Sequence, residues 1–164
     1  MKLRSIKHFI WSIKNRKSIK NWRTRNFSPP SPDIIKHQIL INNNMNDSLW
    51  IETGTYYGNT TQVLSKISKK TVSIEADKAL YELSKKKLNS LKNVEIIFGK
   101  SEDLLEKVIS ENLNFENVCI LIDDIRLFKG NFQNYPNKNS LVEWCKENNF
   151  LWEIEHDIFI CKNK

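Results

Sequence analysis

From residue 49 onward, short apolar runs alternate with longer segments in which apolar residues recur every three or four positions. The short runs predict β-strands at residues 49–51, 71–74, 94–98 and 118–122. The periodic segments predict helices at residues 59–67, 78–91, 102–111 and 140–147. Alternating strands and helices are typical of a parallel sheet covered by helices on both faces. We therefore expect an α/β fold of three layers.

Two further apolar runs, at residues 150–155 and 158–161, lie on either side of His156-Asp157. Their spacing predicts an antiparallel hairpin at the C-terminus. A histidine followed by an aspartate could also serve as a general base with an orienting carboxylate. The position between two strands favours a turn instead, for which aspartate is well suited.

Residues 1–32 follow a different pattern, with apolar residues such as Leu3, Ile6 and Phe9 at helical spacing among basic ones. This segment holds nine Lys or Arg and no acid, whereas residues 33–164 hold seventeen basic and nineteen acidic residues. We predict a basic amphipathic arm, separated by the proline-rich residues 28–32 from one domain at 33–164. The arm either packs on that domain or attaches residues 1–25 to an anionic surface such as a membrane. Nucleic acid is the unlikely partner, because neither an aromatic RNA motif nor zinc-finger spacing is present.

The length of 164 residues suits one well-buried domain. Its three cysteines, at 119, 145 and 161, form no C-x-x-C pair and are expected to be reduced and buried. No apolar run approaches the length that spans a bilayer. These features indicate a cytoplasmic protein, peripheral to a membrane if the arm binds lipid.

The segment after the first predicted strand carries the strongest candidate site. Glu52 ends the apolar run, and Gly54 and Gly58 follow in an E-x-G-x-x-x-G spacing before a helix. A glycine turn at a helix N-terminus lets a ligand approach the backbone, as in nucleotide sites of open α/β sheets. The alternative is an ordinary strand-to-helix turn. The candidate cofactor-binding residues here are Glu52, Thr53, Gly54, Thr55, Tyr56 and Gly58.

The ends of the next two strands extend this site. Glu75, with Ala76, follows the second strand about twenty residues after the glycine turn, where an acid can bind both ribose hydroxyls. A solvated acid at a strand end is the alternative for Glu75. Lys100 and Ser101 follow the third strand, where such sites hold the base, although Ser101 also suits a helix cap.

Asp123 and Asp124, with Arg126 close behind, end the fourth strand and are the candidate catalytic residues. Adjacent carboxylates can hold Mg²⁺, which activates and orients an acceptor hydroxyl. Alternatively, Asp124 caps the following turn and Asp123 contacts the cofactor or Arg126. Residues 131–139 form a polar loop that could contact the acceptor, and both His8 and His37 are expected on the surface.

Together these motifs resemble a bacterial group of class I S-adenosylmethionine (SAM)-dependent methyltransferases associated with surface-polysaccharide genes. The resemblance rests on residues 27–32, 50–61, 73–75, 121–126 and 153–160. It implies SAM as the cofactor, with Glu52, Gly54 and Gly58 around the methionine part and Glu75 on the ribose. It also implies O-methylation of a sugar, glycan or other small hydroxyl acceptor. Lys100 departs from the acid or small polar residue that the group often carries near the adenine.

A larger departure is a segment that the chain lacks before residue 118, where the group has another strand, with an acid, and a helix. The sheet is thus a shortened Rossmann-like methyltransferase sheet, and strand 118–122 should pair with the first strand. Two hypotheses follow: an active methyltransferase, or a degenerate SAM-binding protein without a complete acceptor site. The absence of G-x-G-x-x-G disfavours a nicotinamide-dependent reductase.

Overall fold

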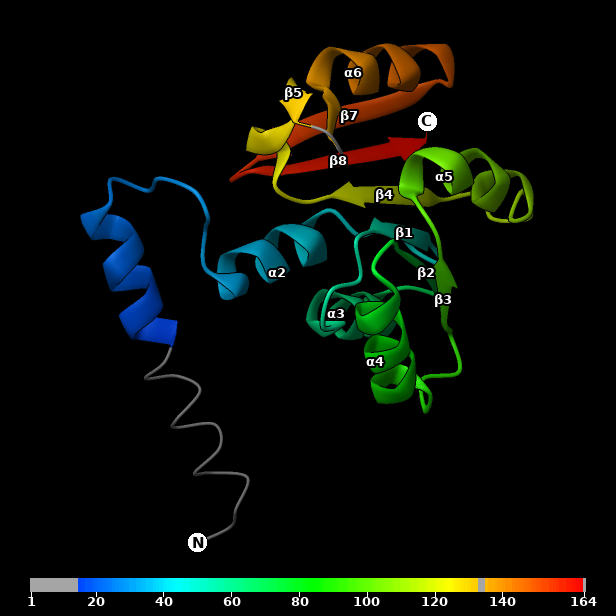
Figure 1. Ribbon diagram of the computed structural model, residues 1–164, viewed down its shortest axis with the longest axis horizontal. Helices are drawn as coiled ribbons and strands as arrows, with labels where there is room; N and C mark the ends of the chain where they lie inside the picture. Colours follow the sequence, from blue (N-terminus) through cyan, green and yellow to red (C-terminus); the bar gives the residue numbers. More distant parts are fainter. Residues whose placement is uncertain (1–14, 133–134, 164) are drawn as a thin grey trace, which may run out of the picture.

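A computed structural model describes residues 15–132 and 135–163 (Figure 1). Its helices are α2 (Asp33–Asn42), α3 (Asn59–Ile67), α4 (Lys78–Leu88), α5 (Ser101–Ser110), η1 (Ile125–Leu127) and α6 (Lys138–Glu147). Its strands are β1 (Leu49–Thr53), β2 (Lys70–Glu75), β3 (Val94–Phe98), β4 (Val118–Ile122), β5 (Lys129–Phe132), β6 (Tyr135–Asn137), β7 (Phe150–Glu155) and β8 (Ile158–Asn163). The α/β order expected from the pattern is confirmed.

The main sheet has six strands in the order β3-β2-β1-β4-β8-β7. β4 pairs in parallel with β1, which confirms the expected place of strand 118–122 beside the first strand. β8 pairs antiparallel with β4, and β7 pairs antiparallel with β8, so the expected terminal hairpin is also present. His156 and Asp157 form its turn, with φ of 46° and 74°. The sheet is therefore mainly parallel, with an antiparallel hairpin at one edge.

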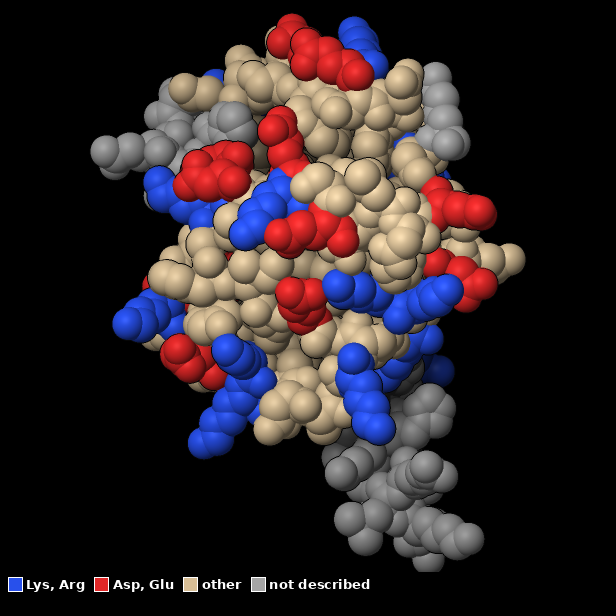
Figure 2. Space-filling model, turned by 90° about the vertical axis from the view of Figure 1, so that its right-hand side faces the viewer, with Lys and Arg blue, Asp and Glu red and all other residues tan. Residues whose placement is uncertain are grey.

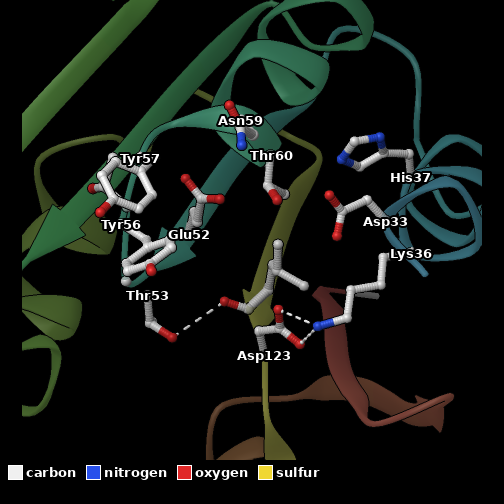
Figure 3. Close-up of a pocket in the computed structure, with 13 residues that line it drawn as sticks. Asp33, Lys36, His37, Glu52, Thr53, Tyr56, Tyr57, Asn59, Thr60 and Asp123 are labelled. Atoms are coloured by element: carbon white, nitrogen blue, oxygen red, sulfur yellow. Dashed lines mark hydrogen bonds and ion pairs between the residues drawn. The ribbon is translucent and has the colours of Figure 1, made fainter. Parts of the chain in front are cut away.

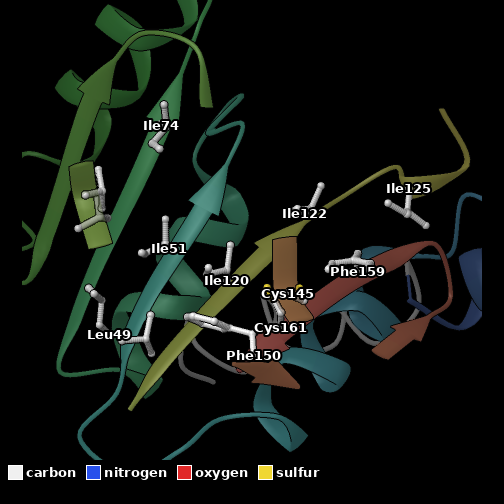
Figure 4. Close-up of a cluster of buried hydrophobic side chains, with 13 residues drawn as sticks. Leu49, Ile51, Ile74, Ile120, Ile122, Ile125, Cys145, Phe150, Phe159 and Cys161 are labelled. Atoms are coloured by element: carbon white, nitrogen blue, oxygen red, sulfur yellow. The ribbon is translucent and has the colours of Figure 1, made fainter. Parts of the chain in front are cut away.

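Alternate residues of the strands face two separate cores. Leu49 and Ile51 face the core under α5 and α6, shown in Figure 4. Trp50, fully buried, faces the other core with Leu40 of α2 and Leu64 of α3. Because β4 is buried on both faces, its sequence is a continuous apolar run, as in central parallel strands. The period-two alternation thus produces the three layers.

Between α5 and α6, the sheet is incompletely covered. A hollow of about 190 Å³ lies over β4 and β8, with Ile120, Ile122 and Phe159 in its lining and Leu105 and Trp144 at its sides. The resemblance predicts a missing helix in this part of the chain.

Some boundaries differ from the expected ones. α4 ends at Leu88 instead of residue 91, because the chain turns there and the Leu91 N–H donates to the Leu88 carbonyl. Residues 131–139 were expected to be a loop, but residues 131–132 belong to β5, residues 135–137 to β6, and residues 138–139 to the start of α6. The Asn137 side chain caps α6 by accepting from the Asn139 N–H, which starts this helix before Ser140.

The basic arm is described only from residue 15, and residues 15–24 are helical. Trp22 is buried against the terminal hairpin, with its ring 4.9 Å from the His156 ring and 5.0 Å from that of Phe27. Its Nε1 donates to the Ser28 carbonyl, which fixes the turn after the helix. This part of the arm packs on the domain. The apolar positions Leu3, Ile6 and Phe9, as well as His8, lie outside the described residues.

The three cysteines are free and buried, as expected. Within residues 15–132 and 135–163, no helix combines the length and the apolar composition needed to cross a bilayer.

Candidate cofactor and acceptor site

A pocket of about 190 Å³ opens where β1 and β4 end, at the carboxyl edge of the parallel strands (Figure 3). α2 lies along one side, and the turn between β1 and α3 forms the opposite side. Open α/β sheets bind ligands at this edge, between strands whose connections run to opposite faces. The lining residues are Asp33, Lys36, His37, Glu52, Thr53, Gly54, Thr55, Tyr56, Tyr57, Asn59, Thr60, Leu121 and Asp123.

Glu52 forms the floor of this pocket and belongs to a buried polar network. Its Oε2 accepts hydrogen bonds from Thr61 Oγ1 and Ser73 Oγ, both at 2.6 Å. Ser73 Oγ also lies 2.6 Å from Thr55 Oγ1, on the turn above. Burial raises the pKa of Glu52 to about 7, although the two hydroxyl donors act in the opposite direction. A carboxyl group that titrates near neutrality inside a pocket is typical of a functional site.

The two glycines of the turn serve different purposes. Gly54 has φ of +92° and a Cβ built there meets no atom within 4 Å, so its backbone is open to the pocket. Gly58 has φ of +66° and caps α3, and its added Cβ would lie 2.7 Å from Leu88 Cδ1 of α4. Gly54 therefore leaves room for a ligand, whereas Gly58 lets α3 begin close to α4.

Gly58→Ala should lower the free energy of unfolding by at least roughly 1–2 kcal/mol, because alanine is strained in the left-handed conformation and its Cβ would also displace the Leu88 side chain. Gly130→Ala is the matched control. Its φ is also positive, at +74°, but its added Cβ would lie 3.4 Å from the nearest atom, and the residue lies outside the pocket lining. Urea unfolding of both variants measures the strain. S-adenosylhomocysteine (SAH) affinity should fall only for Gly58→Ala, and equal effects on both would contradict the role of this turn in the site.

Glu75 lies at the end of β2, beside the pocket but outside its lining. Its carboxylate accepts from the backbone N–H of Tyr56 at 2.7 Å and from that of Asp77 at 2.9 Å. The bond from Tyr56 fixes the glycine turn to the end of β2, and the bond from Asp77 is local to that strand end. A carboxylate accepts about four hydrogen bonds, so Glu75 retains capacity for a ligand. Ala76 follows it at the exposed edge.

Lys100 and Ser101 lie further along this edge, at the end of β3, and neither lines the pocket. The prediction that Ser101 caps α5 is wrong. Lys100 occupies the N-cap position, no side chain caps the helix there, and Ser101 is its first residue. The acids Glu102 and Asp103 in the first turn stabilise the helix dipole instead.

Asp123 and Asp124 have different main cation partners, although Lys36 Nζ also lies 4.0 Å from Asp124 Oδ1. Lys36 Nζ of α2 lies 2.6 Å from both carboxylate oxygens of Asp123. Asp124 Oδ1 accepts from Arg126 Nη1 at 2.7 Å, and the same nitrogen donates to Asp157. Of the two partners expected for Asp123, Arg126 is instead paired with Asp124 and Asp157, and contact with the cofactor stays a prediction. The expectation that the Asp124 side chain caps the turn is wrong. Asp124 does begin η1, with φ of 58°, but without a side-chain cap.

This pairing does not support the magnesium site considered for Asp123 and Asp124. Among the described residues, no three His, Cys, Asp or Glu side chains come together as a metal site requires. Each aspartate has a cation as its partner, which offsets the negative charge that would attract a divalent ion.

Three pocket residues come from α2 and were not recognised in the sequence. Asp33, Lys36 and His37 lie on the helical face that turns toward β1 and β4. His37 was expected on the surface, but it is half-buried, and burial lowers its pKa. Their spacing of three and four residues on one helix was the available signal.

Comparisons with known proteins identify the class first and then the family. A candidate caffeoyl-CoA O-methyltransferase from Staphylococcus aureus aligns over 96% of this chain and 99% of its own, with a TM-score of 0.52 and 16% identity. The fold is thus that of the Rossmann-like methyltransferases. The family model of the ribosomal RNA adenine dimethylases matches residues 31–112, half of the chain. The chain belongs to this family.

One curated relative matches more closely over a short segment. Ribosomal RNA small subunit methyltransferase A of Caldanaerobacter subterraneus subsp. tengcongensis is 50% identical over 56 residues. This match covers 34% of the present chain and 20% of the relative, about a fifth of its length. The comparisons do not show the polysaccharide-associated group.

The prediction that nucleic acid is an unlikely partner and a glycan the acceptor is wrong. The matching family and the curated relative are both named for action on ribosomal RNA. The prediction relied on the absence of aromatic RNA motifs and zinc-finger spacing. Those features define other RNA-binding modules, and a base-modifying enzyme can bind its substrate without them.

Proposed function

We propose that this protein is a SAM-dependent methyltransferase whose acceptor is the amino group of an adenine base in RNA. The observation that carries the proposal is the family match over residues 31–112. That segment contains Glu52, the glycine turn and Glu75, the elements around the pocket. The choice of adenine as acceptor rests on the family, whose name specifies that base.

The residues present fit SAM in two respects. The open backbone at Gly54 and the buried carboxyl of Glu52 lie where the methionine part would bind. Glu75, with its remaining acceptor capacity, lies beside the pocket where the ribose would extend. At about 190 Å³ the pocket is smaller than common ligand sites, so the adenosine would lie outside it, along the edge toward Glu75.

SAM, when bound, supplies an electrophilic methyl group. The chain's contribution is then mainly proximity and orientation of the acceptor nitrogen. Tyr56 and Tyr57 are 61% and 43% exposed at the rim, and aromatic rings stack well on an extruded base. Asp123 lines the same pocket and can accept a hydrogen bond from an amino N–H. Lys36 holds that carboxylate in place.

Asp123→Asn should reduce kcat by roughly 10–100-fold while leaving SAH affinity within about threefold, as expected for a positioned hydrogen-bond acceptor. The amide keeps the shape of the side chain but loses the charge that pairs with Lys36. Single-turnover methylation and SAH titration separate the two effects. Asp124→Asn is the control, because its carboxylate pairs with Arg126 and lies outside the pocket lining. Full activity of Asp123→Asn would remove Asp123 from the acceptor site.

The cofactor proposal is tested by thermal unfolding with SAH, SAM and NAD⁺ in parallel. A ligand at roughly 100 times its Kd adds about 2.7 kcal/mol, which raises Tm by several degrees in a domain of this size. Shifts with SAH and SAM, but not with NAD⁺, are expected. A shift with NAD⁺ alone, or with none of the three, would contradict the proposal.

A further inference from the structure

The helix at residues 15–24 separates its buried and its basic residues onto opposite faces. With 3.6 residues per turn, positions 15, 18, 19 and 22 share one face, and these side chains are half-buried or buried. The opposite face is exposed and carries Arg16, Lys17, Lys20 and Arg23. No acid lies within residues 1–32, so these charges have no neighbouring carboxylate along the arm.

The helix is also held in a defined place relative to the pocket. Its Trp22 packs on His156, in the turn between β7 and β8. The next residue, Asp157, accepts from the Arg126 backbone N–H at 2.8 Å and pairs with the Arg126 guanidinium, which reaches Asp124 beside the pocket. Ser31 Oγ donates to the His156 carbonyl at 3.4 Å and leads directly into α2. In Figure 1 the helix lies on the side toward which β4 ends.

The face of the molecule opposite the arm has a charge distribution different from that of the arm. Figure 2 shows acids and bases mixed in its upper half and mostly Lys and Arg in its lower half. Residues 101–116, which include α5, hold five acids and one lysine. A polyanion is therefore disfavoured along α5, whereas the arm has basic residues and no acid in its own segment.

From this arrangement we infer that the exposed face of helix 15–24 binds the phosphate backbone of the RNA whose base enters the pocket. The inference rests on the proposed function, since it names the surface that holds the same substrate. The arm lies outside the family match at residues 31–112, so that match assigns no role to it. Cations on one exposed face neutralise successive phosphates and make binding depend on salt, without reading the sequence.

The test compares two variants with the same loss of charge. One combines Arg16→Gln, Lys17→Gln, Lys20→Gln and Arg23→Gln. The control combines Lys85→Gln, Lys86→Gln, Lys92→Gln and Lys107→Gln, all exposed residues outside the arm and the pocket lining. The probe is an RNA hairpin with unpaired adenines in its loop, titrated at several salt concentrations.

The arm variant should bind this hairpin on the order of 10–100-fold more weakly. The plot of log K against log salt should also become shallower, with the magnitude of its negative slope reduced by roughly 3. The control variant should keep the wild-type slope. Equal losses in both variants, or an unchanged slope in the arm variant, would overturn the inference. Wild-type binding to anionic phospholipid vesicles that the arm variant loses, with no change in hairpin binding, would also overturn it.

SAH binding distinguishes this inference from the proposed function. Both variants should retain the wild-type SAH shift in Tm, which shows that they are folded. If wild-type protein binds SAH but the arm does not alter RNA binding, only the inference fails. If the arm variant loses RNA binding but the wild-type protein does not bind SAH, only the cofactor proposal fails.

Discussion

Replacing Glu52 by glutamine should raise Tm by roughly 5–10 °C at about pH 8 and leave it nearly unchanged at about pH 5. The reason is the fully buried carboxyl, whose pKa rises from 4.5 to about 7 on folding. In that interval the unfolded chain has lost the proton and the folded chain keeps it. The stability of the wild-type protein therefore falls as pH rises through this interval, by about 3 kcal/mol in total.

A glutamine carries no charge and can accept from Thr61 and Ser73 through its amide oxygen. The variant should therefore lack this fall in stability. Thermal unfolding of both proteins between about pH 5 and pH 9 measures the effect. Glu82→Gln, an exposed change on α4, is the control and should leave the pH dependence as in the wild type. Parallel curves for wild type and Glu52→Gln would show that Glu52 is not the titrating group.

The same substitution should weaken the binding of SAM at a pH above 7. A charged Glu52 attracts the cationic sulfonium and amino groups of SAM, and glutamine does not. In the proposed site, the carboxyl group that lowers stability is thus the one whose charge would attract SAM.

Glu75→Ala should weaken SAH binding by roughly 10–150-fold, which corresponds to about 1.5–3 kcal/mol for hydrogen bonds to a charged group. The structure adds a second reason, because Glu75 also holds the Tyr56 N–H of the glycine turn. Isothermal titration with SAH gives the loss. Glu75→Gln should bind with intermediate affinity, since its amide oxygen can still accept one of these bonds.

Asp77→Ala is the matched control for this prediction. Asp77 is two residues away and caps α4 by accepting from the Leu80 N–H at 2.9 Å. Its loss should lower stability by about 1 kcal/mol without changing SAH affinity. Wild-type affinity in Glu75→Ala would mean that the ribose is bound elsewhere.

Much of the fold could be predicted because it depends on short-range pattern. The alternation of apolar runs and helical periods predicted the layers, and the right-handed crossover rule placed β4 beside β1. The β5–β6 hairpin could not be predicted in this way. Its strands are short and polar, and they have no apolar alternation to distinguish them from a loop.

The site was predictable only in part for a similar reason. Glu52, the glycines and Glu75 lie at fixed offsets from strand ends, which a sequence shows directly. The Lys36–Asp123 pair joins residues 87 positions apart, and it depends on how α2 packs across the pocket. The acceptor was misjudged because the motifs used, the glycine turn and Glu75, were interpreted as cofactor contacts. Those residues do not distinguish a sugar hydroxyl from an adenine amine.

The most direct test of the central claim is methyl transfer from methyl-labelled SAM to ribosomal RNA, followed by digestion to nucleosides and mass spectrometry. The proposal predicts label in adenosine methylated at its exocyclic nitrogen, formed by the wild type and strongly reduced with Asp123→Asn. Label on a ribose hydroxyl or on another base would contradict the proposed acceptor. SAH binding without transfer to any RNA would contradict the proposal of an active RNA methyltransferase.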